Sequence, residues 1–313
     1  MRERGRDHPL RHGAHPRLRD PDPGALSSDS APLRRVALVH ARDALRGPDA
    51  IAAEWRALDW LAPPNFDRAL AEYDGFVAAL EGFGAAVEFL APGEDATLDA
   101  LYPRDASLVV DRGVVTCSMG KAARRGEPAA AGRALAALGL PVLGGIEGNG
   151  RLEGGDTAWL DERTLAVGLG RRTNREGVEQ LRALFAAGGD APEVLAIPLP
   201  DWRGPNDVFH LMSVLSPIDR DLAVVYPPLL PAPLRAALAE RGIQLVAVPD
   251  EELDTLGCNV LAVAPGRCLM LEGNPETRRR LERAGAEVTV FAGKEICLKG
   301  GGGPTCLTRP LVR

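Results

Sequence analysis

The chain repeats one order of local signals about every fifty residues, a period typical of repeat architectures. Glycines close five predicted helices at Gly84, Gly139, Gly188, Gly242 and Gly285, so the spacings are 55, 49, 54 and 43 residues. At each of these positions we expect a left-handed helix C-cap. A unit of this size is one supersecondary module, too short for a separate domain.

Each unit also carries two short apolar segments joined by a polar turn, which predicts a β-hairpin. The four hairpins read "ASLVVDRGVVTCSM", "TAWLDERTLAVGL", "SVLSPIDRDLAVVY" and "VLAVAPGRCLML". With the helices that follow and an N-terminal unit, this gives five ββαβ units. Since none can bury a face alone, we predict an α/β fold in which they close around a pseudo-fivefold axis as a five-bladed propeller.

Residues 1–33 differ from this pattern. They are rich in Arg, His, Pro and Asp and show no hydrophobic period. We therefore interpret residues 1–33 as a disordered N-terminal extension and residues 34–313 as a single catalytic domain.

Composition limits the classes of binding partner and the cellular compartment that we expect for this chain. A net charge of −6 argues against a nucleic acid and is compatible with a small cation. Neither a secretory signal nor 18 consecutive apolar residues is present, so we expect no membrane partner. The cysteines contain no CxxC pair, which favours a reduced, cytoplasmic setting; they are Cys117, Cys258, Cys268, Cys297 and Cys306. A homodimer is left open.

Reactive residue types fall just before the first strand of successive hairpins. They stand in "YPRD", "LEGGD", "FH" and "GCN", and in the tail "KGGGGPTCLTRPLVR": Asp105, Glu153, Asp156, His210, Asn259 and Cys306. In a closed ring such positions converge at one end of the axis, and the glycine run lets another group approach Cys306.

This set predicts nucleophilic catalysis by a thiolate. Cys306 needs a base, for which His210 is the natural partner, with Glu153 orienting the imidazole. Additional acids would raise the pKa of the thiol unless they hold a cationic substrate. A planar guanidinium fits because it binds carboxylates two at a time and stays charged. The cysteines and histidines show no metal-ligand spacing, so we expect no metal and no other cofactor.

Six segments resemble, in order, the motifs of the guanidino-group-modifying enzymes, which include arginine deiminases, dimethylarginine dimethylaminohydrolases and amidinotransferases. They are "YPRDASLVV", "LEGGDTAWL", "VGLGRRTNREG", "FHLMSVLS", "GCNVLAVAPGR" and "GGGGPTCLTRPL". The resemblance covers residues 34–313. It implies the five-bladed pentein fold and hydrolysis of arginine or an N-substituted arginine, through a covalent Cys intermediate, to a ureido product of the citrulline type.

Carried over motif by motif, the resemblance implies Cys306 as nucleophile, His210 as acid and base, and Glu153 as the carboxylate partner of His210. Asp105 is implied as the substrate guanidinium ligand and Arg172 as an anchor for substrate polar groups. Asp156, also assigned to the substrate side, closes the "EGGD" turn.

Two positions depart from the family pattern. Deiminases and amidinotransferases usually carry a second carboxylate two residues after the histidine, where this chain has Met212. Gly301 occupies the site at which many deiminases have an arginine, and Lys299 is nearby.

Two alternatives to hydrolysis stay open at this point. An amidinotransferase would pass the amidino group to an amine, and a non-catalytic propeller would serve as a binding module. In addition, the Pro-Pro pair in "LDWLAPPNFDRA" (58–69) predicts a loop, which is either a connector or a lid that excludes water.

Overall fold

Five three-stranded sheets form the body of the protein in the computed structural model, which describes residues 28–189, 191–204 and 209–313. The sheets are β15-β1-β2, β3-β4-β5, β6-β7-β8, β9-β10-β11 and β12-β13-β14. The strands are β1 Arg35–Leu38, β2 Ala86–Phe89, β3 Ser107–Val110, β4 Gly113–Thr116, β5 Val142–Gly145, β6 Thr157–Asp161, β7 Thr164–Leu169, β8 Glu193–Pro198, β9 Leu215–Asp219, β10 Leu222–Val225, β11 Gln244–Ala247, β12 Leu261–Ala264, β13 Arg267–Leu271, β14 Glu287–Phe291 and β15 Arg309–Val312. The predicted five-bladed α/β architecture is confirmed.

Four sheets are built in the predicted ββαβ order. In one of them, β6 and β7 form an antiparallel hairpin, and β8 returns parallel to β7 after a crossover helix. The sheets that begin with β3, β9 and β12 repeat the same pairing. A parallel return needs such a crossover, which explains why each unit takes about fifty residues.

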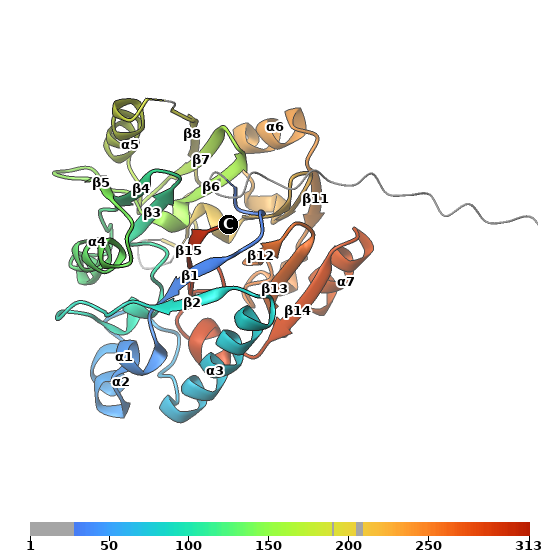
Figure 1. Ribbon diagram of the computed structural model, residues 1–313. Helices are drawn as coiled ribbons and strands as arrows, with labels where there is room; N and C mark the ends of the chain where they lie inside the picture. Colours follow the sequence, from blue (N-terminus) through green and yellow to red (C-terminus); the bar gives the residue numbers. More distant parts are fainter. Residues whose placement is uncertain (1–27, 190, 205–208) are drawn as a thin grey trace, which may run out of the picture.

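The remaining sheet joins the two ends of the described chain. The last strand, β15, pairs antiparallel with β1, and β1 pairs parallel with β2. The first strands of the units lie next to one another, β9 beside β6 and β12, and β15 beside β3. The sheets surround a centre into which the C-terminal strand runs (Figure 1). The ring thus closes around its axis.

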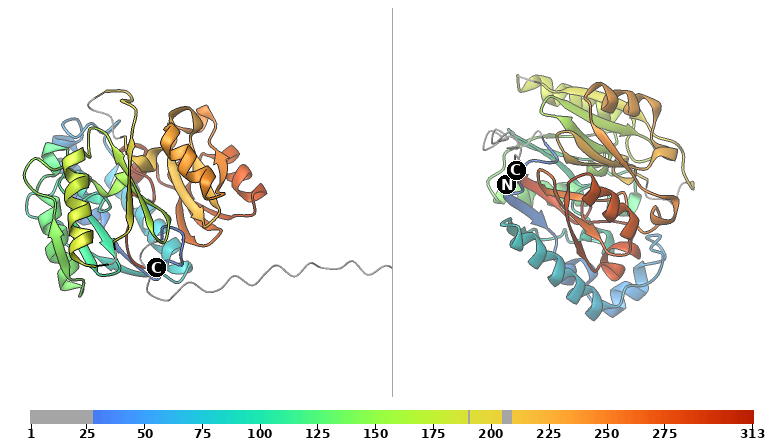
Figure 2. Two further views of the ribbon diagram at one scale, coloured as in Figure 1. Left: turned by 90° about the horizontal axis from the view of Figure 1, so that it is seen from above. Right: turned by 90° about the vertical axis from the view of Figure 1, so that its right-hand side faces the viewer.

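Helices cover the outside of the ring, as two further views also show (Figure 2). They are α1 Ala41–Leu45, α2 Pro48–Glu54, α3 Phe66–Gly82, α4 Glu127–Ala137, α5 Arg175–Ala187, α6 Ala232–Glu240 and α7 Pro275–Arg283. In α5, for example, the apolar stripe Val178, Leu181 and Phe185 is buried against its sheet. No helix of the described ranges is both long and apolar enough to cross a membrane.

The glycines that close the helices have the predicted left-handed backbone with one exception. Gly84, Gly139, Gly242 and Gly285 have φ between 66° and 98°. After α5, Gly188 has φ −94°, so that prediction is wrong there. The next residue, Gly189, takes the left-handed conformation with φ 103° because the helix extends one residue further.

Ordered contacts begin before the predicted boundary at residue 34. Ser30, Ala31 and Leu33 are buried, and the Leu33 N–H donates to the Val263 carbonyl at 2.8 Å. Residues 28–33 therefore pack against the body, which differs from the extension expected for residues 1–33. The rest of that predicted extension, residues 1–27, lies outside the described residues.

Candidate active site

Five loops bring the predicted reactive residues together, each loop preceding the innermost strand of one sheet. Asp105 precedes β3, Glu153 precedes β6, His210 precedes β9, Asn259 precedes β12 and Cys306 precedes β15. The Gly154 N–H donates to the Asp105 carbonyl at 3.0 Å, and the Arg104 N–H to the Cys306 carbonyl at 3.4 Å. The closed ring is thus the cause of the convergence.

His210 and Glu153 form a buried hydrogen-bonded pair. The His210 Nε2 lies 2.7 Å from Glu153 Oε2, and the other ring nitrogen, Nδ1, lies 3.9 Å from Asp105 Oδ1. Burial lowers the pKa of His210, but Asp105, Asp156 and Glu153 outweigh it and raise this pKa to about 9. The imidazole is therefore protonated at neutral pH and able to act as an acid.

Glu153 is held in place by the backbone and by one cation. Its Oε1 accepts from the Gly120 N–H at 2.8 Å and lies 3.6 Å from Arg172 Nη1. The Glu153 N–H donates to Thr173 Oγ1 at 3.1 Å. Burial raises the pKa of Glu153, yet the imidazolium and Arg172 lower it overall, so the carboxylate stays ionised. Arg172 therefore contacts the acid of the pair in this structure.

Asp105 has a partner that sequence reasoning missed. Its Oδ2 accepts from Arg124 Nη1 at 2.6 Å, and its Oδ1 accepts from the Gly155 N–H at 3.1 Å. A Cβ at Gly155 would lie 2.7 Å from both Asp105 Oδ1 and His210 Nδ1, so only glycine permits this approach. Arg124 lies in "KAARRGEP", outside the repeat positions, and nothing in the sequence pattern marked it.

Asp156 uses both carboxylate oxygens inside the protein. Oδ1 accepts from the Leu211 N–H at 3.0 Å, and Oδ2 accepts from Thr173 Oγ1 at 2.6 Å. Burial raises the pKa of Asp156 to about 6. Because its bond to Leu211 joins the short 3-10 helix Gly154–Asp156 to the residue after His210, Asp156 fixes the backbone that carries the imidazole.

Cys306 differs from the other cysteines in its surroundings. It is only half-buried, and its Sγ lies 3.5 Å from Asn259 Nδ2 and 3.8 Å from Thr305 Oγ1. Burial and Asp105 raise the pKa of the Cys306 thiol, with a smaller opposing contribution from these two hydrogen bonds. The four fully buried cysteines are Cys117, Cys258, Cys268 and Cys297.

The glycine run before Cys306 packs against aromatic and amide side chains. A Cβ at Gly300 would lie 2.0 Å from Tyr102 Oη, and one at Gly303 would lie 2.4 Å from Asn259 Oδ1. Since Asn259 contacts the sulfur, this close packing sets the position of the thiol. The run is therefore a packed turn in this structure.

Cys306 and His210 line one cavity of about 210 Å³. Met212 lines it too, and the carboxylates among its described lining residues are those of Asp59 and Asp254. Asp105, Glu153, Asp156 and Arg172 do not line it. The structure thus places the thiol and the imidazole on the cavity wall and the acids behind the imidazole.

Backbone strain is concentrated around this cavity. Four described non-glycine residues have positive φ, and three of them line it: Asp59 (60°), Arg203 (53°) and Leu256 (63°). Residues with such backbone conformations cluster at functional sites, where the surrounding structure offsets their cost.

The predicted loop at residues 58–69 ends where α3 begins, at Phe66. Its Leu61 lines the cavity with 78% of its surface exposed. The Leu61 N–H donates to the Lys299 carbonyl at 2.7 Å, and Lys299 Nζ donates to the Pro63 carbonyl at 3.0 Å. The loop therefore rests on the segment that carries the glycine run.

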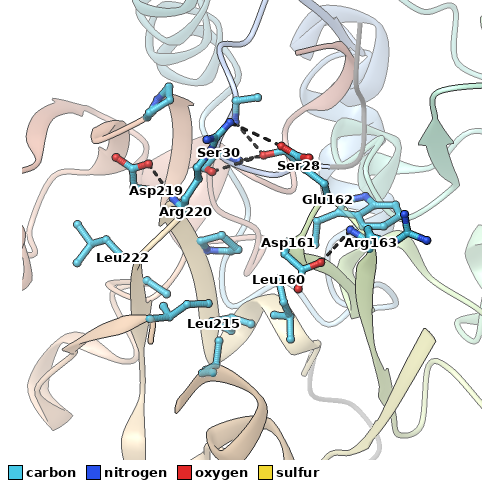
Figure 3. Close-up of a pocket in the computed structure, with 17 residues that line it drawn as sticks. Ser28, Ser30, Leu160, Asp161, Glu162, Arg163, Leu215, Asp219, Arg220 and Leu222 are labelled. Atoms are coloured by element: carbon cyan, nitrogen blue, oxygen red, sulfur yellow. Dashed lines mark hydrogen bonds and ion pairs between the residues drawn. The ribbon is translucent and has the colours of Figure 1, made fainter. Parts of the chain in front are cut away.

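A larger cavity of about 360 Å³ lies between the hairpins β6–β7 and β9–β10 (Figure 3). Ser28 and Ser30 border it on one side, and Leu160 and Leu215 lie on the hairpins. No predicted site residue lines it, so its volume carries no argument about catalysis.

One set of described side chains has the spacing of a metal site. Ligand atoms of Asp105, Glu153 and His210 lie within 4.8 Å of one another. The Glu153 and His210 atoms already bond to each other at 2.7 Å, and an ion between them would have to break that bond.

The comparisons with known proteins agree with this architecture. The family model described as "N,N dimethylarginine dimethylhydrolase, eukaryotic" matches residues 59–313. An arginine deiminase of Rhodococcus erythropolis is 33% identical over 191 residues, which cover 52% of this chain and 46% of that protein. The chain thus spans about half the length of the arginine deiminases that it matches.

Solved structures share the fold at low identity. DDAH from Pseudomonas aeruginosa, complexed with citrulline, has a TM-score of 0.72 at 20% identity, covering 90% of this chain and all of that one. The N-terminal domain of ArgZ, an arginine dihydrolase from Cyanobacteria bound to its product, has a TM-score of 0.73 at 21% identity, covering 88% and 96%.

Proposed function

This chain belongs to the dimethylarginine dimethylaminohydrolase and arginine deiminase superfamily of guanidino-group-modifying enzymes, and we propose that it hydrolyses arginine or an N-substituted arginine to a ureido product. The observation that carries the proposal is the cavity that exposes Cys306 and His210 on one wall while Glu153 binds the imidazole from behind. Relatives bound to citrulline or a reaction product support the substrate class.

Charge explains why the substrate should be a cation. Burial and Asp105 raise the pKa of the Cys306 thiol, so the protein groups around the sulfur disfavour the thiolate. Asp59 lines the cavity, as does Asp254, which is paired with Arg203 at 2.7 Å, and a guanidinium bound there would place positive charge next to the sulfur and lower that pKa. Substrate binding and nucleophile activation are then one event.

The chemistry follows in two halves. The Cys306 thiolate adds to the guanidinium carbon, and the tetrahedral intermediate expels an amine that takes its proton from the His210 imidazolium. The amidino group remains on sulfur as a thioether. Neutral His210 then takes a proton from water, the resulting hydroxide attacks the same carbon, and the thiolate leaves with release of the ureido product.

The acids next to His210 stabilise its positive charge in both halves of the reaction, whenever the imidazole is protonated. Glu153 bonds to Nε2 directly, whereas Asp105 lies near Nδ1 and is paired with Arg124. We propose Asp156 and Arg172 as positioning residues, since one fixes the backbone at Leu211 and the other contacts Glu153. The contact of Asp105 with the guanidinium stays a prediction, and Asp105→Asn tests it: a raised KM supports substrate binding, and a lowered kcat with unchanged KM supports a role through His210.

The test is a substrate screen with a matched cysteine control. Arginine, its methylated forms, agmatine and guanidino acids are assayed for a ureido product, with Cys306→Ser and the buried Cys268→Ser in parallel. We expect Cys306→Ser to lose activity by about 10³-fold or more and Cys268→Ser to keep it. Turnover by Cys306→Ser at the parent rate would refute the nucleophile.

The same screen separates the alternatives. Amine release without an added acceptor indicates hydrolysis, and dependence of turnover on an amine acceptor indicates an amidinotransferase. Ligand binding without any product would favour a non-catalytic module.

A further inference from the structure

Three buried arginines surround another, much smaller cavity of about 20 Å³. Arg104, Arg309 and Arg313 are 3%, 3% and 4% exposed, and Asp29 supplies the only carboxylate among the described lining residues. The other described residues that line it are Ser28, Leu108, Val109, Thr157, Trp159 and Pro310. Among the described lining residues, three buried cations therefore face one carboxylate.

The contacts leave most of this charge unpaired. Arg104 Nη2 bonds to Asp29 Oδ1 at 3.0 Å, which is the only arginine–carboxylate bond described in the cluster. Arg309 Nη2 donates to the Arg104 carbonyl at 2.6 Å, and Arg313 Nη1 donates to the carbonyls of Ala31 and Ala262 at 2.9 and 3.0 Å. Carbonyls accept hydrogen bonds but carry no net charge.

A donor on each arginine also has no partner. The Nε atoms of Arg104, Arg309 and Arg313 are buried without a hydrogen-bond partner among the described residues. A buried, unpaired donor on a charged group is costly. Burial and the neighbouring Arg104 lower the pKa of Arg309 to about 9, which reflects the same repulsion.

We propose that this cavity binds a monatomic anion, a halide such as chloride. About 20 Å³ admits one species of roughly the size of a water molecule, which excludes phosphate and organic anions. A water could satisfy donors but could not compensate the charge of three guanidinium groups against one carboxylate. The proposal is independent of the catalytic function, because no catalytic residue lines this cavity.

Two measurements on the full chain test the site directly. Crystals are soaked in bromide, and we expect an anomalous peak between the three arginines. Thermal unfolding is followed in sodium chloride, bromide and gluconate at equal ionic strength, and we expect the two halides to raise Tm by about 2 °C or more over gluconate. The absence of a bromide peak in the cavity, or equal Tm values in the three salts, would overturn the proposal.

Substitutions of the charged residues test whether the halide-dependent rise in Tm comes from this cavity. Arg313→Gln removes one cation and should abolish the halide-dependent shift, whereas Arg278→Gln, in an exposed pair with Glu282, should keep it. Asp29→Asn removes the competing carboxylate and should enlarge the shift. If Arg313→Gln does not fold, Asp29→Asn alone decides: an unchanged or smaller shift than in the parent contradicts an anion in this cavity.

Discussion

The catalytic site and the arginine-lined cavity are built from the same chain segments but differ in how their charges are paired. The loop before β3 supplies Asp105, whose Oδ1 lies 3.9 Å from His210 Nδ1, to the catalytic site and Arg104 to the arginine-lined cavity. The C-terminal segment supplies Cys306 to the first and Arg309 and Arg313 to the second. Neighbouring residues on one backbone thus serve two electrostatically different sites.

The difference lies in how the charge is balanced. Each catalytic acid has a described cation beside it, namely His210 or Arg172 for Glu153 and Arg124 for Asp105. The arginine cluster has only Asp29. The catalytic acids are already paired, whereas a buried charge without a partner is strongly destabilising, so a bound anion would stabilise the arginine cluster. The first arrangement suits turnover and the second suits a resident ion.

The largest effect is expected from a variant that removes the ion pair between Glu153 and His210. Glu153→Gln keeps the size of the side chain but removes the charge that holds the imidazolium. We expect kcat to fall by about 10²- to 10³-fold and the alkaline limb of the pH–rate profile to move to lower pH, because Glu153 is one of the acids that raise the pKa of His210. The exposed Glu282→Gln is the control, and a profile that keeps its alkaline limb would contradict the pairing.

The ion pair between Glu153 and His210 also predicts how the free energy of unfolding depends on pH. The pKa of His210 is raised from 6.5 to about 9, so the proton on His210 stabilises the fold. This contribution is fully present below pH 6.5 and is lost as pH rises through 9, by up to about 3 kcal/mol. Asp156, with a pKa of about 6, is largely ionised throughout this interval.

Unfolding midpoints measured between pH 6.5 and 9.5 check this prediction. The parent should lose stability over that interval, and His210→Gln should give a flatter curve. Parallel curves for the two proteins would show that His210 does not carry the effect.

The sequence predicts the catalytic site better than the arginine cluster. The repeat fixes which loops meet at the axis, and each reactive residue occupies the same place in its unit, so Asp105, Glu153, His210 and Cys306 could be placed together. No comparable rule applies to Arg124 or Asp29. Their contacts depend on side-chain directions and on a segment outside the repeat.

The glycine run shows a second limit of sequence reasoning. A run of four glycines permits both a loose tail and a close approach, and the sequence alone does not distinguish them. The structure does, because Tyr102 fills the space beside Gly300. This aromatic partner lies nearly two hundred residues earlier in the chain, and only the closure of the ring brings the two together.

A smaller effect is expected from a substitution in the C-terminal segment, which lines both cavities. Gly300→Ala would place a Cβ 2.0 Å from Tyr102 Oη, and we expect a loss of about 1–3 kcal/mol in the free energy of unfolding. Gly75→Ala is the matched control, since nothing lies within 4 Å of its Cβ inside α3, and it should stabilise slightly. Denaturant titrations of both variants measure the difference, and equal stabilities would show that the run is not tightly packed.

The smallest expected effect concerns the loop around Leu61, which borders the catalytic cavity and has no counterpart described at the arginine cluster. Leu61→Ala should raise KM about 3- to 10-fold and leave Tm nearly unchanged, because this side chain lines the cavity but is largely exposed to solvent. Leu245→Ala, on the exposed face of β11, is the matched control. Limited proteolysis supplies an independent readout: if the loop is a lid, substrate should protect the bonds near Pro63, and a digestion pattern indifferent to substrate would leave the loop as a connector.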